Sequence, residues 1–233
     1  MPSSSTQSSS TQSSPTRSSA TSSRSKPLFS TSCKRCPRLV KFLKQVKKDH
    51  PDYYSKPVPA FGADKARLCI VGLAPGMHGA NATGRPFTGD HAGIMLYETL
   101  FKYGFSSSRY SVANDDLRLI DSRITNAVKC LPPQNKPIGA EVNTCNRWLT
   151  QELIILPENH VIVALGAIAH KAVIKSLQLK QRDFKFGHGA QHKLNNGILI
   201  DSYHCSRYNT QTKRLTQAMF DDIFKRAKQW LNK

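Results

Sequence analysis

Cysteine spacing carries the first chemical signal in this sequence. Cys33 and Cys36 are separated by two residues, a gap that lets both thiolates bind one metal centre. Cys130 and Cys145 follow much later, with 14 residues between them. A zinc ribbon needs a second pair with a two-residue gap, whereas four scattered thiolates can hold a cubane iron–sulfur cluster. The spacing therefore favours a metal centre, with four ordinary buried cysteines as the alternative.

Reactive polar side chains are concentrated in three further segments: 72–90, 126–130 and 204–209. Asp90, the only acid of the first segment, could act on a reacting group or could merely cap the helix expected after it. Asn126 offers both a donor and an acceptor, although a turn residue would look the same. His204 follows an apolar run and can donate a hydrogen bond, and a solvated or satisfied histidine is its plain alternative.

The apolar pattern explains where these three segments lie. Short apolar runs bounded by Gly and Pro alternate with stretches of helical periodicity, which indicates an α/β sandwich with a mainly parallel sheet. In such sheets ligands bind beyond the carboxyl ends of the strands, and each segment follows a predicted strand or overlaps its end. Strands are expected at 67–73, 124–128, 160–165 and 198–202, and helices at 39–46, 95–101, 142–156, 167–177 and 215–231.

Composition limits the class of protein. The 233 residues, enough for one large or two small domains, carry 34 Lys and Arg against 15 Asp and Glu, a formal charge of +19. A hydrophobic content of 39% excludes a wholly disordered chain, and no apolar run reaches the roughly 20 residues of a membrane span, so a soluble protein is expected. The charge favours a polyanionic partner, nucleic acid first and an anionic membrane surface second.

The N-terminal 32 residues differ from the rest. They are mostly Ser and Thr and are expected to be a disordered tail, with residues 33–233 forming the folded domain. Only three of the 34 basic residues lie in the tail, so the domain keeps 31 basic against 15 acidic residues. The tail lacks the apolar stretch of a secretory signal, so an intracellular protein of the cytoplasm or nucleoid with free thiols is expected. An organelle transit peptide is the alternative reading of the tail.

The three polar segments resemble the motifs of the iron–sulfur uracil-DNA glycosylases. They read Gly72-Leu-Ala-Pro-Gly-Met-His78-Gly-Ala-Asn81-Ala-Thr-Gly-Arg85-Pro-Phe87-Thr-Gly-Asp90, Thr125-Asn126-Ala-Val-Lys-Cys130 and His204-Cys-Ser-Arg-Tyr-Asn209-Thr. Leu73 stands where the family 4 branch carries an acid, which makes the chain most similar to the type-B branch, or family 5. The resemblance covers roughly residues 33–233. It implies a three-layer α/β/α sandwich and a 4Fe-4S cluster held by Cys33, Cys36, Cys130 and Cys145.

The resemblance further implies a monofunctional DNA glycosylase of base excision repair. Such an enzyme hydrolyses the N-glycosidic bond of uracil, with other deaminated bases as further candidates, and leaves an abasic site. The base must be flipped into a pocket, and bond cleavage develops positive charge on the sugar and negative charge on the base. Asp90 would stabilise the sugar and activate water, His204 would donate to a uracil carbonyl oxygen, and Asn126 would bind the edge of the base.

The remaining expected roles concern binding of the substrate and of the surrounding DNA. A substrate-binding role is expected for Gly72, Ala74, Gly76, His78, Phe87 and Asn209, with Phe87 stacking on the flipped base. Arg207 and Tyr208 would contact DNA at the flipped position, and Lys129, Lys213 and Arg214 are candidate phosphate contacts, each with a solvated surface charge as its alternative. DNA is the expected partner of a monomeric protein.

Departures from the family motifs keep two other readings open. The third motif reads His204-Cys205-Ser206-Arg207 instead of His-Pro-Ser-Pro, which predicts a looser loop and places an oxidisable thiol beside His204. Ala82 stands where the first motif often has Arg. A catalytically impaired nucleic-acid-binding module that retains the fold and the cluster is therefore the first alternative. An unrelated α/β enzyme that binds nucleotide phosphate on the glycine-rich loop is the second.

Overall fold

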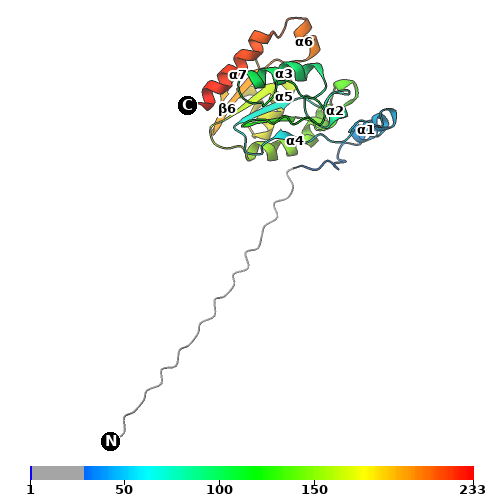
Figure 1. Cartoon of the computed structure of the whole chain (residues 1–233), viewed down its shortest axis with the longest axis horizontal. Coiled ribbons are helices and arrows are strands. Elements are labelled where there is room, and N and C mark those ends of the chain that lie inside the picture. Colours follow the sequence, from blue (N-terminus) through cyan, green and yellow to red (C-terminus); the bar gives the residue numbers. More distant parts are fainter. Residues whose placement is uncertain (2–28) are drawn as a thin grey trace.

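The computed structural model describes Met1 and residues 29–233, which form one six-stranded sheet with helices on both faces (Figure 1). The strand order is β1-β3-β2-β4-β6-β5, and the four central strands run parallel. The two edge strands are short and antiparallel. The expected mainly parallel sheet is therefore confirmed. The strands are β1 (Phe61–Gly62), β2 (Leu68–Gly72), β3 (Ser122–Asn126), β4 (His160–Leu165), β5 (Gln191–Lys193) and β6 (Gly197–Ser202).

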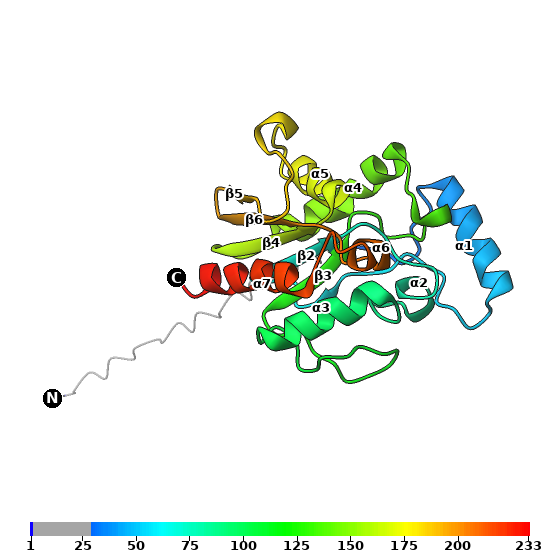
Figure 2. The ribbon, with the colours of Figure 1, turned by 90° about the horizontal axis from the view of Figure 1, so that it is seen from above.

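Alternating side chains of the central strands divide the core into two layers. Leu68 and Ile70 of β2 pack in one apolar cluster, and the intervening Cys69 and Val71 pack in another on the opposite face. Helices α3 and α7 cover the first face, and α4 and α5 cover the second (Figure 2). The three-layer α/β/α sandwich is thus confirmed. These four helices are α3 (His91–Lys102), α4 (Gly139–Ile154), α5 (Ala167–Ser176) and α7 (Gln217–Leu231).

Helix α1 (Pro37–Asp49) stands at the edge of the domain, beside the short α2 (Ala80–Thr83) (Figure 2). Pro37 occupies its first turn, where a missing N–H costs nothing. Its apolar face packs through Leu39, Leu43 and Val46 in a third cluster that includes Cys130 and Cys145. The N-terminal helix is therefore attached to the segment that leaves β3 and to α4.

Every predicted long element is present, with small shifts at the ends. Strand β3 ends at Asn126 rather than at residue 128, because the next two backbone N–H groups turn to the carbonyls of Gly72 and Leu73. The elements that the pattern missed are the edge strands and short helices such as α2 and α6 (Arg207–Gln211). No described helix is long and apolar enough to span a bilayer.

The predicted boundary between tail and domain falls close to the start of the described segment. Residues 2–28, for which disorder was expected, lie outside the described residues. Phe29 packs edge-on against Trp148, with 5.6 Å between ring centroids, so a residue four positions before Cys33 already contacts the domain. The boundary at residue 32 itself stays a prediction.

Candidate active site

An open cleft of about 1120 Å³ lies at the carboxyl ends of the parallel strands. Asp90, Asn126 and His204, which come from three distant segments, all line it. The prediction that the three polar segments meet at this edge of the sheet is therefore confirmed, and their chemical roles stay predictions. Of the other expected contacts, Ala74, Gly76, His78, Phe87 and Arg207 also line the cleft.

Asp90 is both a helix cap and a cleft residue. Its Oδ1 accepts a hydrogen bond of 2.9 Å from the Gly93 N–H, which caps the N-terminus of α3. Its Oδ2 faces the glycine loop, where a Cβ on Gly79 would lie only 2.5 Å away. Burial raises the pKa of Asp90 above its usual range, although the backbone N–H groups of Gly93 and Ala92 oppose that shift. The capping and catalytic interpretations are thus compatible, because each uses a different oxygen.

Asn126 ends β3 and is almost fully buried, with an Oδ1 that has no hydrogen-bond partner among the described residues. Buried amide oxygens are normally satisfied, so an orphaned one that faces a cleft indicates a place for a ligand donor. Gly72 does not line the cleft itself. A Cβ there would lie 2.4 Å from Asn126 Oδ1 and 2.7 Å from the Phe87 ring, so this glycine makes room for both side chains.

The Gly72→Ala variant is expected to fold and to lose at least tenfold in kcat/KM for the uracil excision that the motif resemblance implies. The added methyl must displace the Asn126 amide or the Phe87 ring, because both contacts are shorter than van der Waals distance. Circular dichroism would check the fold, and kinetics on a uracil-containing oligonucleotide would check activity. Gly139→Ala is the matched control, because nothing lies within 4 Å of its added Cβ. Equal rates for both variants would contradict the assigned role of Gly72.

Phe87 lines the cleft in a conformation that sequence reasoning could not supply. Its φ is +55°, in the left-handed region that non-glycine residues rarely adopt. Gly93 of α3 lies directly against its carbonyl group, where any Cβ would clash at 1.8 Å. The ring is 5.9 Å from the His204 ring, with 26° between the two planes. The Phe87 and His204 rings therefore lie nearly parallel to each other at the cleft.

His204 leaves β6 with its ring enclosed. Its Nδ1 is buried without a partner among the described residues. Burial lowers the pKa of His204 to about 4, so the imidazole is neutral at pH 7 and carries one N–H. Asn209 does not line the cleft; its side-chain amide donates a 2.8 Å hydrogen bond to the His204 carbonyl. Asn209 therefore positions His204 rather than contacting the cleft itself.

The third motif forms a compact turn into α6. The expectation that Cys205 would be open to oxidation is wrong, because this residue is fully buried and its thiol donates to the Ala92 carbonyl. Ser206 Oγ caps α6 by accepting the Asn209 N–H, and the expected loosening of the loop stays a prediction. Arg207 begins this helix at the cleft, and Tyr208 is 70% exposed just outside it.

Lys129 does not face DNA. Its ammonium group is buried and lies 2.7 Å from a carboxylate oxygen of Glu152, so the predicted phosphate contact is wrong. No lysine of the described segment lines the cleft. Lys213 and Arg214 are exposed beyond α6, and their phosphate contacts stay predictions.

Several features of the cleft were missed because they depend on contacts between residues that are distant in sequence. His78 is held by Tyr53, whose hydroxyl lies 2.8 Å from His78 Nδ1. The loop that includes Tyr110 and Val112 lines one side of the cleft. Arg85 holds this loop through an ion pair with Asp115. The sequence of this loop shows neither helical nor strand periodicity. Residues 85 and 115 are too far apart in the chain for a local pattern to predict that they form an ion pair.

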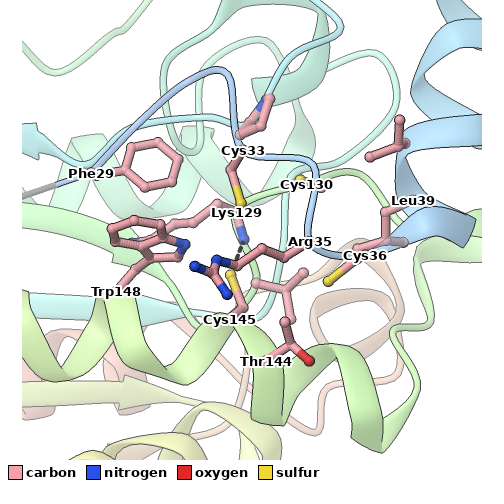
Figure 3. A pocket seen from close by; sticks show the side chains of 13 residues that line it. Phe29, Cys33, Arg35, Cys36, Leu39, Lys129, Cys130, Thr144, Cys145 and Trp148 are labelled. Atoms are coloured by element: carbon pink, nitrogen blue, oxygen red, sulfur yellow. Dashed lines mark hydrogen bonds between the residues drawn. The ribbon is translucent and has the colours of Figure 1, made fainter.

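The four predicted metal-binding cysteines line one small, mostly apolar pocket (Figure 3). Cys33 and Cys36 approach from the segment before α1, Cys130 follows β3, and Cys145 belongs to α4. Burial, followed by the nearby thiols, raises the pKa of Cys130.

The four thiols do not form a compact single-ion site among the described residues. No three of these sulfur atoms lie within 4.8 Å of one another in the described part of the chain, as the ligands of one ion would. The one such group there is His170, His192 and Asp201. Both His170 nitrogens already face acceptors, Asp201 Oδ1 and the Phe184 carbonyl, which indicates a buried ion pair.

Comparison with known proteins agrees with this geometry. The sequence model of the uracil DNA glycosylase superfamily matches residues 59–228. The type-5 uracil-DNA glycosylase of Thermus thermophilus is 47% identical over 205 residues, which cover 85% of this chain and 93% of that protein. The type-5 enzyme of Pyrobaculum aerophilum is 41% identical over 84% of this chain and 88% of its own. The type-4 uracil-DNA glycosylase of the same organism is 37% identical over 62% of this chain and 60% of its own.

Proposed function

The chain belongs to the uracil-DNA glycosylase superfamily, and from that premise we propose that it excises uracil from DNA in the manner of the type-5 enzymes. The observation that carries the proposal is the cleft in which Asp90, Asn126 and His204 converge. Two of these residues, Asn126 and His204, each have a buried polar atom without a hydrogen-bond partner among the described residues. The reaction is hydrolysis of the N-glycosidic bond, which releases uracil and leaves an abasic site in DNA.

In the proposed reaction Asp90 acts on the sugar side of the bond. Its Oδ1 stays bound to the Gly93 N–H, which holds the carboxylate in place. The other oxygen faces the cleft, where it stabilises the positive charge that develops on the sugar and orients the attacking water. The buried position strengthens this interaction, because few waters are present to screen it.

In the proposed reaction His204 and Asn126 bind the base on the other side of the bond. A neutral imidazole donates one N–H to a carbonyl oxygen of uracil, which gains negative charge as the bond breaks. Asn126 Oδ1, which lacks a donor in the described structure, accepts from the N–H on the edge of uracil. Phe87 stacks on the flipped base beside the His204 ring.

Water is the proposed nucleophile, and no lyase step follows. A lyase needs an amine that can attack the sugar, and none of the described lysines lines the cleft. Lys129, which is closest to the motif in sequence, has its ammonium group bound to Glu152. The enzyme is therefore monofunctional.

The proposal is tested with a uracil-containing oligonucleotide treated with alkali after incubation. Alkali breaks the strand at abasic sites, so strand breaks that require both enzyme and alkali are expected. Breaks before alkali treatment would indicate a lyase. Binding of the oligonucleotide without any break would favour the catalytically impaired nucleic-acid-binding module instead.

We also propose that the four-cysteine pocket holds a 4Fe-4S cluster. The donor set fits, because four thiols from three separate segments surround an apolar pocket, and the Lys129 N–H already donates to Cys145 Sγ at 3.3 Å. When bound, the cluster would cross-link the segment before α1 to β3 and α4 and would have a structural role. Iron and acid-labile sulfide should accompany anaerobically purified protein, and their absence would remove this part of the proposal.

Phe29 and Trp148 are expected to shield this cluster from solvent. Both rings line the pocket, and the Lys129 ammonium group lies 5.8 Å from the Phe29 ring (Figure 3). Phe29→Ala should therefore speed the loss of visible cluster absorbance in air by several-fold. Phe101→Ala, which removes a half-exposed ring from α3, is the matched control. Identical decay in the two variants would show that Phe29 offers no protection.

A further inference from the structure

The outer face of α1 carries an unusual density of positive charge. Residues 34–48 contain seven Lys and Arg and no acid. Among them Arg38 pairs with Glu141, and Lys47 donates to the Tyr53 carbonyl. The side chains of Lys41, Lys44 and Lys48 are exposed, and they form no ion pair with any described residue.

These three lysines share one side of the helix. Their spacing of three and four residues places them on the face opposite the buried Leu39 and Leu43. The face has no packing function, because the helix attaches to the domain through its apolar side. The positive charges on a basic face without acids repel one another unless an anionic partner neutralises them.

The C-terminal end of α1 leads directly to the cleft. His50, which follows the last turn, stacks on Tyr53 with 4.4 Å between ring centroids. Tyr53 in turn bonds His78, and His78 lines the cleft. Figure 2 shows α1 alongside α2 at the edge of the domain. The end of the helix that carries the basic face is therefore linked to the cleft through His50, Tyr53 and His78.

We propose that the face of α1 formed by Lys41, Lys44 and Lys48 binds the phosphate backbone of DNA beside the flipped base. This inference rests on the proposed function. The 13 residues of the helix span roughly 20 Å, about six base-pair steps at 3.4 Å of rise each. Lysine ammonium groups suit such contacts, because they are mobile point charges that need no fixed phosphate geometry. The surface supplies affinity that is independent of sequence and leaves the chemistry to the cleft.

The test removes three charges from α1 and, in a matched control, three from elsewhere. The first variant combines Lys41→Gln, Lys44→Gln and Lys48→Gln, changes that preserve helix propensity. The control combines Lys193→Gln, Lys225→Gln and Lys233→Gln, which are exposed on β5, on α7 and at the C-terminus that follows α7, away from α1 (Figure 2). The Kd for a duplex with a non-hydrolysable abasic-site analogue, and for an undamaged duplex, is measured between roughly 50 and 200 mM salt.

The α1 variant is expected to lose about 2–3 units from the slope of log Kd against log salt, since each phosphate contact contributes about 0.9. Both duplexes should weaken alike, and the single-turnover rate at saturating protein should stay unchanged. The control should keep the wild-type slope. Equal losses in the two variants, or none in either, would overturn the proposal. If the wild type fails to excise uracil, the proposed function falls, and the slopes still decide whether α1 binds DNA.

Discussion

Asp90→Asn is expected to lower the single-turnover rate of uracil excision by roughly 10²–10⁴-fold, the range typical of a lost catalytic carboxylate. The change removes the negative charge that faces the cleft. It keeps the helix cap, because the asparagine carbonyl can still accept the Gly93 N–H. Asn is among the best capping residues, so the thermal midpoint should hardly move.

Asp90→Ala separates the two roles of this side chain. It should lose the same activity and, in addition, about 1 kcal/mol of stability, because the α3 cap is removed. Denaturant unfolding of both variants measures that difference. Wild-type excision rates in Asp90→Asn would refute the catalytic assignment and spare the uracil-DNA glycosylase function.

The raised pKa of Asp90 fixes the direction of the pH dependence. The carboxylate must be ionised to stabilise the sugar, so excision should fall as the pH drops through this raised value. The acid limb of the wild-type rate profile should therefore lie above the pH expected for a solvated aspartate.

His204→Ala is expected to reduce the excision rate by about 10²–10³-fold, as for the loss of one preorganised donor. Affinity for a duplex that carries an abasic-site analogue should change little, because the base is absent from that complex. Single-turnover kinetics and Kd measurements together test this division. A large loss of affinity with an unchanged rate would assign His204 to DNA binding instead.

His204 also makes a definite contribution to acid stability. Its pKa is 6.5 in ordinary surroundings and about 4 in the folded protein, so protonation favours the unfolded chain. Protonation linked to His204 therefore lowers the free energy of unfolding as the pH falls from about 6.5 towards 4. Denaturant unfolding of His204→Ala should show a flatter decline over that window than the wild type shows.

The spacing of apolar residues, together with the Gly and Pro residues between segments, predicts the central sheet and its covering helices well. These elements are long and regular. The parallel strands are fully buried and read as continuous apolar runs, which is why β2 and β4 stand out in the sequence. Edge strands of two and three residues are too short to show any alternation. Asn126 could be placed at the end of a strand, and so beside the cleft, without knowledge of its partners.

Features of the site that depend on distant contacts could not be predicted. Lys129 looks like a phosphate ligand until α4 brings Glu152 against it. Cys205 looks reactive until β6 and α6 turn its thiol into the core. Phe87 has a left-handed backbone, and its carbonyl lies directly against Gly93 of α3, a contact that no local pattern indicates. In each case the sequence identifies the residue type, and tertiary packing determines what that residue does.

The four-cysteine pocket has a consequence for the timing of biosynthesis. Cys36 leaves the ribosome 109 residues before Cys145, so at about 5–20 residues per second roughly 5–20 seconds pass before the pocket can close. During that interval α1 lacks the part of its apolar cluster that follows β3 and lies on α4. Complete docking of α1, and insertion of the proposed 4Fe-4S cluster, must therefore await the synthesis of α4.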